Sequence, residues 1–361
     1  MRKSKLLTAA LLLLCAAVAT AQSEIAPYMP GVTQEGAVYY LPKTALRFTV
    51  QVEKTTYSPG QFCMYAARYL RLNDVQQEAS VAYRVTNVTV TTLGVADNKR
   101  AYAVKFNPKS VAANVSLAED GRLLAINTTN KDVDTMPSKF VASPKPKRED
   151  PRKYLSADIL AAGSTAKMAE LTAQDIYEIR DSKNQLNRGE ADFMPKDGQQ
   201  LRIMLDNLDK QEREMTLLFT GIVEKDTTEH TFVVCPESEI NKQVLFRLSQ
   251  KLGFVDKDDL SGAPFYLTVE DLHSIPTTPA DAVAPKKKKE TESGIYVNVP
   301  GKAKASVTNG GKTVASVEFN AGQFGKVELL SGELFNKRST TRLTLNPITG
   351  AVDRLDAEMP K

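Results

Sequence analysis

Histidine, the side chain that most often serves as a general base, is scarce in this chain. The 361 residues include two histidines, His230 and His273. Neither stands at metal-ligand spacing from another histidine or from a cysteine, and a serine or cysteine triad needs a histidine base. His230 follows Thr227-Thr228-Glu229, which predicts a solvated turn, and His273 adjoins a proline-rich stretch. The sequence therefore predicts no catalytic residue in these classes.

Acidic residues are numerous enough for carboxylate chemistry, but their spacing selects no pair. Glycoside hydrolysis requires two carboxylates, and Glu190 and Asp192 are better explained as solvated loop residues between helices. The segment Asp256-Lys257-Asp258-Asp259 begins like a calcium loop, yet Gly262 comes one place late and Leu267 stands where that loop needs glutamate. We therefore predict no cofactor and no metal site. Because acidic residues are numerous, a carboxylate-dependent glycan hydrolase is kept as an alternative to a non-enzymatic function.

Two cysteines and two threonines are candidates for modification outside the cytoplasm. Cys63 and Cys235 follow the N-terminal segment, and they could form one bridge in an oxidising compartment. Two separate buried thiols are the favoured alternative, because free cysteine packs as a small hydrophobe and the sequence alone does not show that the two Cα atoms come within bridging distance. Thr135 in an Asp-Thr-Met triplet and Thr227 in an Asp-Thr-Thr triplet resemble the Asp-Thr-X acceptors of a bacterial O-glycosylation system. Both threonines are predicted to lie in polar loops.

The strongest local charge cluster is the run Lys286, Lys287, Lys288 and Lys289. Such a run could bind a polyanion or an anionic lipid surface, which gives a third possible function. Two glutamates follow at once, however, and no aromatic residue is interleaved to stack on nucleic-acid bases. The run falls in residues 275–293, which contain three prolines and no apolar periodicity. This composition predicts a disordered, Pro- and Lys-rich loop.

The N-terminus has the three parts of a secretory signal. Basic residues precede an apolar run at 6–18, and Ala19-Thr20-Ala21 offers the small residues that signal peptidase reads. This predicts a signal peptide at 1–21 and a mature chain starting at Gln22. Its three basic residues leave with it, which takes the formal net charge from +4 close to neutral, so we expect no nucleic-acid partner. No later segment is apolar enough to span a bilayer, so we expect a soluble periplasmic or outer-membrane-associated protein.

Residues 22–154 predict an N-terminal β-rich domain. Residues 46–53 alternate apolar and polar side chains, which is typical of a half-buried strand. Ser58-Pro59-Gly60 ends this strand. Apolar side chains then recur at helical spacing over residues 62–69, which predicts a short helix. Asp97-Asn98 predicts a turn between two strands, and residues 115–126 predict a hairpin around Glu-Asp-Gly.

Residues 155–216 predict an αα-hairpin. Ser164 can cap the first helix and Gly189 can end it, whereas Asp197 with Gln200 resembles a capping box at the start of the second. Each helix carries an apolar stripe. The stripe could be a partner-binding face, but an amphipathic helix normally buries its stripe, so core packing is favoured.

Residues 217–361 predict a C-terminal β-rich domain that contains the loop at 275–293. Short strands alternate with turns, one strand is expected at 218–223, and Asn309-Gly310 signals a hairpin. The stretch after 293 is too short to be stable alone, so its strands should share one core with strands between 217 and 269. The expected fold class is α+β, with two β-rich, sandwich-like regions that flank the αα-hairpin and pack in series.

Several short segments resemble a family of proteins. The segment Tyr39-Tyr40-Leu41-Pro42-Lys43-Thr44 is similar to one in exported proteins of Gram-negative bacteria that have no assigned function, as are residues 189–192, 217–221 and 323–325. The resemblance implies an envelope or secreted location and no chemistry. We therefore expect a non-enzymatic envelope protein, a binding or structural module whose partner is an unknown envelope protein or a glycan.

Overall fold

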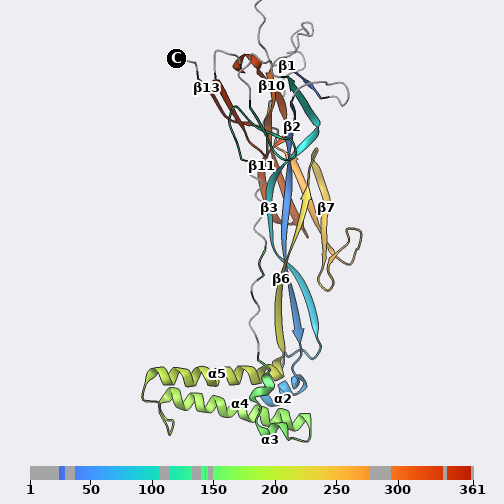
Figure 1. Ribbon diagram of the computed structural model, residues 1–361. Helices are drawn as coiled ribbons and strands as arrows, with labels where there is room; N and C mark the ends of the chain where they lie inside the picture. Colours follow the sequence, from blue (N-terminus) through green and yellow to red (C-terminus); the bar gives the residue numbers. More distant parts are fainter. Residues whose placement is uncertain are drawn as a thin grey trace, which may run out of the picture.

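The computed structural model describes residues 24–28, 37–105, 114–131, 140–142, 144, 149–276, 294–335 and 340–358. They form an elongated α+β molecule with three parts (Figure 1). A head of β-sheets lies at one end, a stalk of three strands leads away from it, and a base of helices lies at the far end. The predicted signal peptide, Thr135 and the lysine run 286–289 lie outside the described residues.

Three antiparallel sheets build the head and the stalk. The first has the order β1 (Glu24–Pro27), β3 (Ser80–Lys105), β2 (Ala37–Ser58) and β6 (Ile222–Val234). The second has the order β11 (Lys312–Ser331), β10 (Gly294–Asn309), β9 (Ala263–Asp271), β7 (Ile240–Ser249) and β8 (Gly253–Val255). The third has the order β13 (Val352–Glu358), β12 (Thr340–Leu345), β5 (Leu123–Ile126) and β4 (Val115–Leu117).

The two β-rich segments are interleaved and do not pack in series. β6 pairs with β2, and β12 pairs with β5, so two sheets combine strands from both segments. β10 pairs with β9, which is the expected pairing of strands on either side of residues 275–293. Pairing between strands this far apart in sequence depends on tertiary packing, which periodicity alone does not reveal.

Two apolar cores stabilise the head. In the first, alternate residues of β2, including Phe48 and Val50, pack against side chains of the second sheet such as Leu267 and Val307. This alternation is the predicted half-buried strand at 46–53. The second core lies between the upper end of β2 and the third sheet, and Tyr39 is among its fully buried members.

The stalk consists of the lower parts of β2, β3 and β6. Glu53 on the central strand lies opposite Arg84 on one side and Thr227 on the other. The Arg84 guanidinium donates to the Glu53 carboxylate at 2.9 Å, and this hydrogen bond holds the pKa of Glu53 below its usual value. Polar cross-strand pairs of this kind stabilise a sheet whose two faces are largely open to solvent.

The base is built from two excursions out of the first sheet. The first follows β2 and contains the short helices η1 (Cys63–Tyr65) and α2 (Ala66–Leu70). The second precedes β6 and contains η2 (Pro151–Tyr154), α3 (Ala157–Leu160), α4 (Thr165–Arg188) and α5 (Gly198–Thr220). Apolar side chains from both excursions form a third core, among them Phe62, Ile176 and Phe219.

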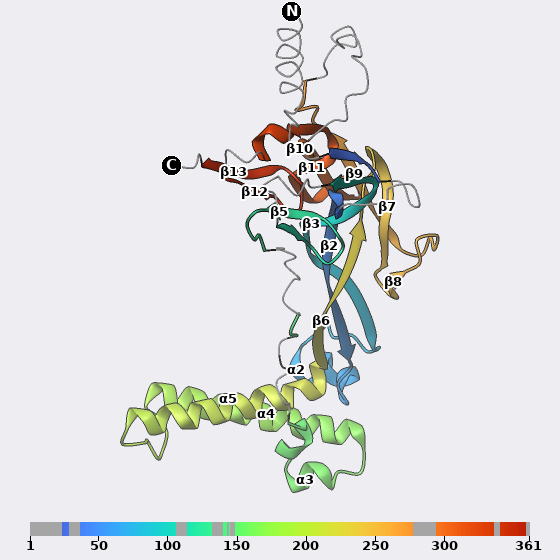
Figure 2. The ribbon, with the colours of Figure 1, turned by 45° about the horizontal axis from the view of Figure 1, so that its top comes forward.

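The predicted αα-hairpin is α4 and α5, and its caps are largely those predicted. The Ser164 side chain accepts from the amide of Lys167, and Gly189 ends α4 with a left-handed φ of +73°. Asp197 caps α5 through the amide of Gln199. Figures 1 and 2 both show the pair extending sideways from the foot of the stalk.

Two predicted element boundaries are wrong. Residues 218–223 are not one strand, because α5 continues to Thr220 and Gly221 turns the chain into β6. Asp97 and Asn98 form no turn between strands, because β3 runs through them without interruption. Asp97 is instead a buried residue that lies 3.6 Å from the guanidinium of Arg100.

Candidate functional site

The stalk meets the base at a junction of closely packed backbones. A Cβ on Gly60 would lie 2.3 Å from the Leu218 carbonyl oxygen, to which the Phe62 amide donates at 2.7 Å. Gly221 has a φ of +77°, and a Cβ there would lie 2.5 Å from the Ser58 carbonyl oxygen. The two glycines therefore allow the chain after β2 and the end of α5 to approach at backbone distance.

Tyr57 joins the two excursions at this junction. Its hydroxyl lies 2.6 Å from the Gln76 carbonyl of the first excursion and 3.0 Å from the Thr220 carbonyl of the second. A phenol carries one proton, so both carbonyls share a single donor. Burial raises the pKa of Tyr57, and the nearby Cys63 adds to this. The hydroxyl therefore stays protonated, as this arrangement requires.

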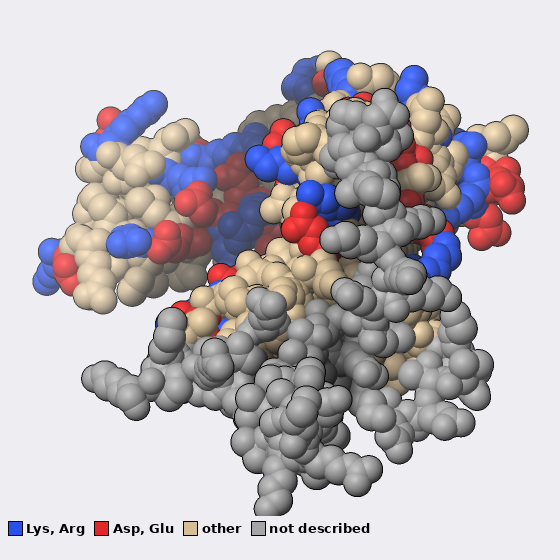
Figure 3. Space-filling model, turned by 90° about the horizontal axis from the view of Figure 1, so that it is seen from above, with Lys and Arg blue, Asp and Glu red and all other residues tan. Residues whose placement is uncertain are grey.

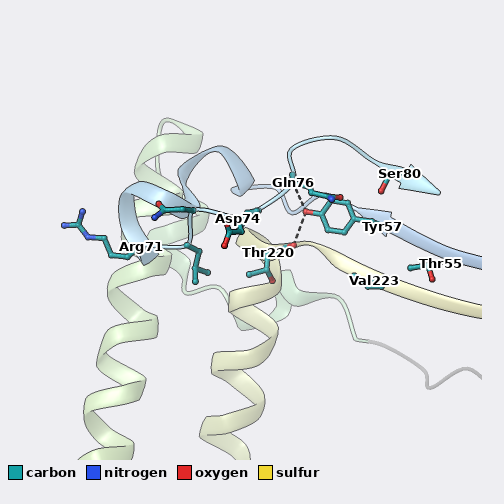
Figure 4. A pocket seen from close by; sticks show the side chains of 11 residues that line it. Thr55, Tyr57, Arg71, Asp74, Gln76, Ser80, Thr220 and Val223 are labelled. Carbon is teal, nitrogen blue, oxygen red and sulfur yellow. Dashed lines mark hydrogen bonds between the residues drawn. The ribbon is translucent and has the colours of Figure 1, made fainter. Parts of the chain in front are cut away.

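A pocket of about 680 Å³ opens beside Tyr57. Its walls come from the three stalk strands, the end of α5 and the loop at residues 71–76 (Figure 4). Figure 4 shows Asp74, Gln76 and Ser80 along the chain that faces Tyr57, whereas the guanidinium of Arg71 points away from the other labelled side chains. We call this hollow the junction pocket.

The polar side chains of the loop are free of hydrogen bonds to the part of the chain that the structure describes. Within the described part of the chain, the side chains of Asn73, Asp74 and Gln76 make no hydrogen bond to another residue. The hollow of about 620 Å³ in the head differs in this respect. There, the Arg122 side chain donates to the Asp120 carboxylate at 2.7 Å and also to a backbone carbonyl.

The hairpin carries a polar cluster where α4 and α5 leave the base core. Glu212 accepts from Arg180 at 2.6 Å and from Lys183 at 2.8 Å, and Lys183 also pairs with Asp209. Burial alone would raise the pKa of Glu212, but the hydrogen bonds from Lys183 and Arg180 outweigh it and hold the pKa below its usual value. The same contacts raise the pKa of Lys183. This cluster fixes the two helices against each other with charge-assisted bonds.

Beyond this cluster, large apolar side chains remain exposed at the free end of the hairpin. The side chain of Phe193 in the loop is 89% exposed, and Ile203 on α5 is 53% exposed. Met194 and Met204 are exposed beside them in the sequence. Seen from above in Figure 3, the hairpin is the lobe at the left, where small mixed groups of basic and acidic side chains surround an uncharged area. We call Phe193, Met194, Ile203 and Met204 the hairpin tip.

The two cysteines are free thiols and lie at opposite ends of β6. Cys63 is in the base, and Cys235 follows the upper end of that strand. A strand of 13 residues spans roughly 40 Å at about 3.3 Å per residue, which is far beyond the ~7 Å over which a disulfide can form. Of the two readings left open by the sequence, the structure shows separate thiols.

The structure places His230 in a strand, so the predicted turn is wrong. It lies in β6 opposite Val50, and its ring centroid is 4.2 Å from that of Phe254. Burial lowers the pKa of His230. Thr227, expected in a polar loop, also lies in this strand, where it pairs with Glu53. The polar residues 224–229 resemble a turn in the sequence because this part of β6 lies in the solvated stalk and has no buried apolar face.

The other residues considered for chemistry are dispersed. Glu190 and Asp192 lie in the loop of the αα-hairpin and are exposed. His273 is an exposed residue beside Asp271 at the end of β9. The segment at 256–259 is a turn in which Asp259 accepts from the amide of Ser261. No group of three or more His, Cys, Asp or Glu is placed to hold a metal within the described ranges.

Two of the segments that carry the family resemblance, residues 39–44 and 323–325, make hydrogen bonds that hold the head together. Asn298 donates to the carbonyls of Pro42 and Thr349, and Gln323 donates to the Thr44 carbonyl and accepts from the Thr44 amide. These bonds join three sheets at the middle of the head. The pocket loop carried no recognisable motif, so sequence reasoning missed it as a site. For the hairpin, core packing of the apolar stripes was favoured over a partner-binding face, although Met204 of the stripe on α5 is exposed.

Comparisons with known proteins identify the family and nothing more specific. Residues 35–353 match the model of a family described as a domain of unknown function, DUF4831, and the chain belongs to that family. No curated protein and no solved structure matches the chain. Among the described residues, no helix has the length and apolar character needed to cross a membrane.

Proposed function

We propose that this member of the DUF4831 family is a non-enzymatic exported protein of the cell envelope, a binding module that presents its hairpin tip to a partner protein. The observation that carries the proposal is the exposure of Phe193 and its apolar neighbours at the free end of a projecting pair of helices. Exposed apolar groups gathered in one place commonly mark interaction sites. The N-terminal sequence is the basis for the exported location.

The way in which the tip is held also supports a binding role. The helices of the hairpin are 24 and 23 residues long, which places the tip roughly 35 Å from the helix ends at the base. The cluster around Glu212 and the glycine junction fix the direction of this arm. Presentation on rigid elements lowers the entropy lost on binding.

Site-specific photo-crosslinking tests the proposal. A photoreactive residue at position 193 should give one defined crosslinked product in the native envelope, whereas the same residue at Asn184, an exposed position on the same hairpin, should not. With the captured partner purified, Phe193→Ala should raise Kd roughly thirtyfold, about 2 kcal/mol, as expected for an aromatic anchor.

Equal crosslinking from both positions, or from neither, would contradict the role of the tip. The location has its own test, because the exported protein should begin at Gln22. A mature protein that still carries Met1 would contradict the exported location.

A further inference from the structure

We propose that the junction pocket binds a neutral glycan. The inference is independent of the hairpin tip, which lies at the other end of α5. It rests on the polar groups that line the pocket, on their charge, on the apolar side chains that also line it and on the position of the pocket on the stalk.

The pocket offers hydrogen-bonding groups that no other described residue uses. Asn73 and Gln76 each present a carboxamide with two donors and one acceptor oxygen, and Asp74 presents a carboxylate. Planar groups of this kind bind neighbouring hydroxyls in pairs, with each hydroxyl able to donate and to accept. A polyhydroxylated ligand therefore matches the donors and acceptors of this loop.

The charge of the pocket favours a neutral ligand. Asp74 is the one carboxylate among the described residues that line the pocket. Arg71 is the one cation there, and Figure 4 shows its guanidinium pointing outwards. An acidic ligand would meet the Asp74 carboxylate without a facing cation, which disfavours it. A single carboxylate also lacks the partner that glycoside hydrolysis needs, so the pocket is suited to bind a glycan and not to cleave it.

Apolar side chains also line the pocket, from the loop and from β6. Leu72, Val75 and Val223 line the pocket together with Tyr57. Sugar rings are amphipathic, because their hydroxyls point outwards around the ring and their C–H groups form apolar faces. The volume of about 680 Å³ lies within the ~300–1,000 Å³ of small-molecule sites.

The position of the pocket disfavours an extended peptide. Thr55 and Tyr57 belong to β2, which is paired along both edges at this level, with β3 and with β6. The pocket therefore lies over the face of a sheet whose central backbone groups are already bonded. A peptide that binds by adding a strand needs an unpaired edge, whereas a glycan binds through side chains of the kind found here.

The test uses the full mature protein and three neutral trisaccharides, namely maltotriose, mannotriose and N-acetylchitotriose, titrated by calorimetry and ligand-observed NMR. Trigalacturonate and a neutral hexapeptide serve as the acidic and peptide probes. The variant Asp74→Ala/Gln76→Ala removes the two side chains and keeps the Gln76 carbonyl that Tyr57 uses. The control, Asp206→Ala/Gln211→Ala, changes the same residue types at exposed positions of α5.

We expect at least one neutral trisaccharide to bind the wild type and the control equally, and to bind the pocket variant at least about tenfold more weakly. Both variants should keep the wild-type Tm, because the changed side chains are exposed. The proposal is overturned if none of the neutral trisaccharides binds, if the pocket variant binds as well as the control, or if only trigalacturonate or the peptide binds.

Discussion

Substitution of Gly60 by alanine should loosen the base from the stalk. The new Cβ would lie 2.3 Å from the Leu218 carbonyl oxygen and 2.7 Å from that of Leu217. Both atoms belong to the backbone of α5, so no flexible side chain can move aside. Either the chain at Gly60 or the last turn of α5 must shift by about an ångström, because the atoms in conflict belong to the backbone.

The cost follows from what the shift would break. The Phe62 amide would lose its bond to Leu218, worth about 1 kcal/mol net. The Phe62 and Phe219 rings, with centroids 5.4 Å apart, would lose part of a contact worth about 1 kcal/mol. Strain in a packed core adds about 1 kcal/mol or more. We therefore expect Gly60→Ala to destabilise the base by about 3 kcal/mol.

Hydrogen exchange measured by mass spectrometry resolves the base from the head. Gly60→Ala should speed exchange in peptides that cover residues 61–70 and 213–221, and leave head peptides such as 303–309 unchanged. Gly163→Ala is the matched control, because a Cβ there meets no atom within 4 Å. Exchange and Tm in Gly60→Ala that equal those of Gly163→Ala would refute the reasoning.

Three further predictions concern charge and thiols. Glu212→Gln should destabilise the base by about 1 kcal/mol at pH 7. Because the folded pKa of Glu212 is lowered, this contribution is lost as pH falls through the folded value, so urea unfolding of the two proteins should converge at acidic pH. Burial lowers the pKa of His230, so the unfolded state gains the proton first below about pH 6.5. Head stability should therefore fall with pH in that range, and a His230→Phe variant should lose less Tm between pH 7.5 and 5. Without reductant, Cys63 and Cys235 should both be alkylated in denaturant, giving a mass gain of two labels where a disulfide would give none.

Elements that satisfy their own caps and burial locally could be predicted from the sequence. The αα-hairpin is the clearest case, since Ser164, Gly189 and Asp197 act on the helices they adjoin. The strand at 46–53 was predictable for a similar reason, because its alternate side chains face one apolar layer. The hairpin at 115–126 follows from its own turn.

The stalk could not be predicted, because its strands are stabilised by pairing and not by a buried face. The lower part of β6 reads Glu-Lys-Asp-Thr-Thr-Glu, which in isolation has the composition of a turn. Its strand character depends on β2, which is more than 160 residues earlier in the sequence, where Glu53 pairs with Thr227. The junction pocket was missed for the same reason, since its walls come from segments near residues 55, 74 and 220.

The side chains chosen for substitution in the pocket and at the tip lie apart from the apolar cores that stabilise the fold. The two head cores contain no residue of the junction pocket or of the hairpin tip. Asp74, Gln76 and Phe193 are exposed and lie outside the base core as well. Substitutions at exposed positions away from buried contacts usually change stability by no more than about 0.5 kcal/mol. A loss of binding in such variants can therefore be assigned to the removed side chain, provided that Tm stays at the wild-type value.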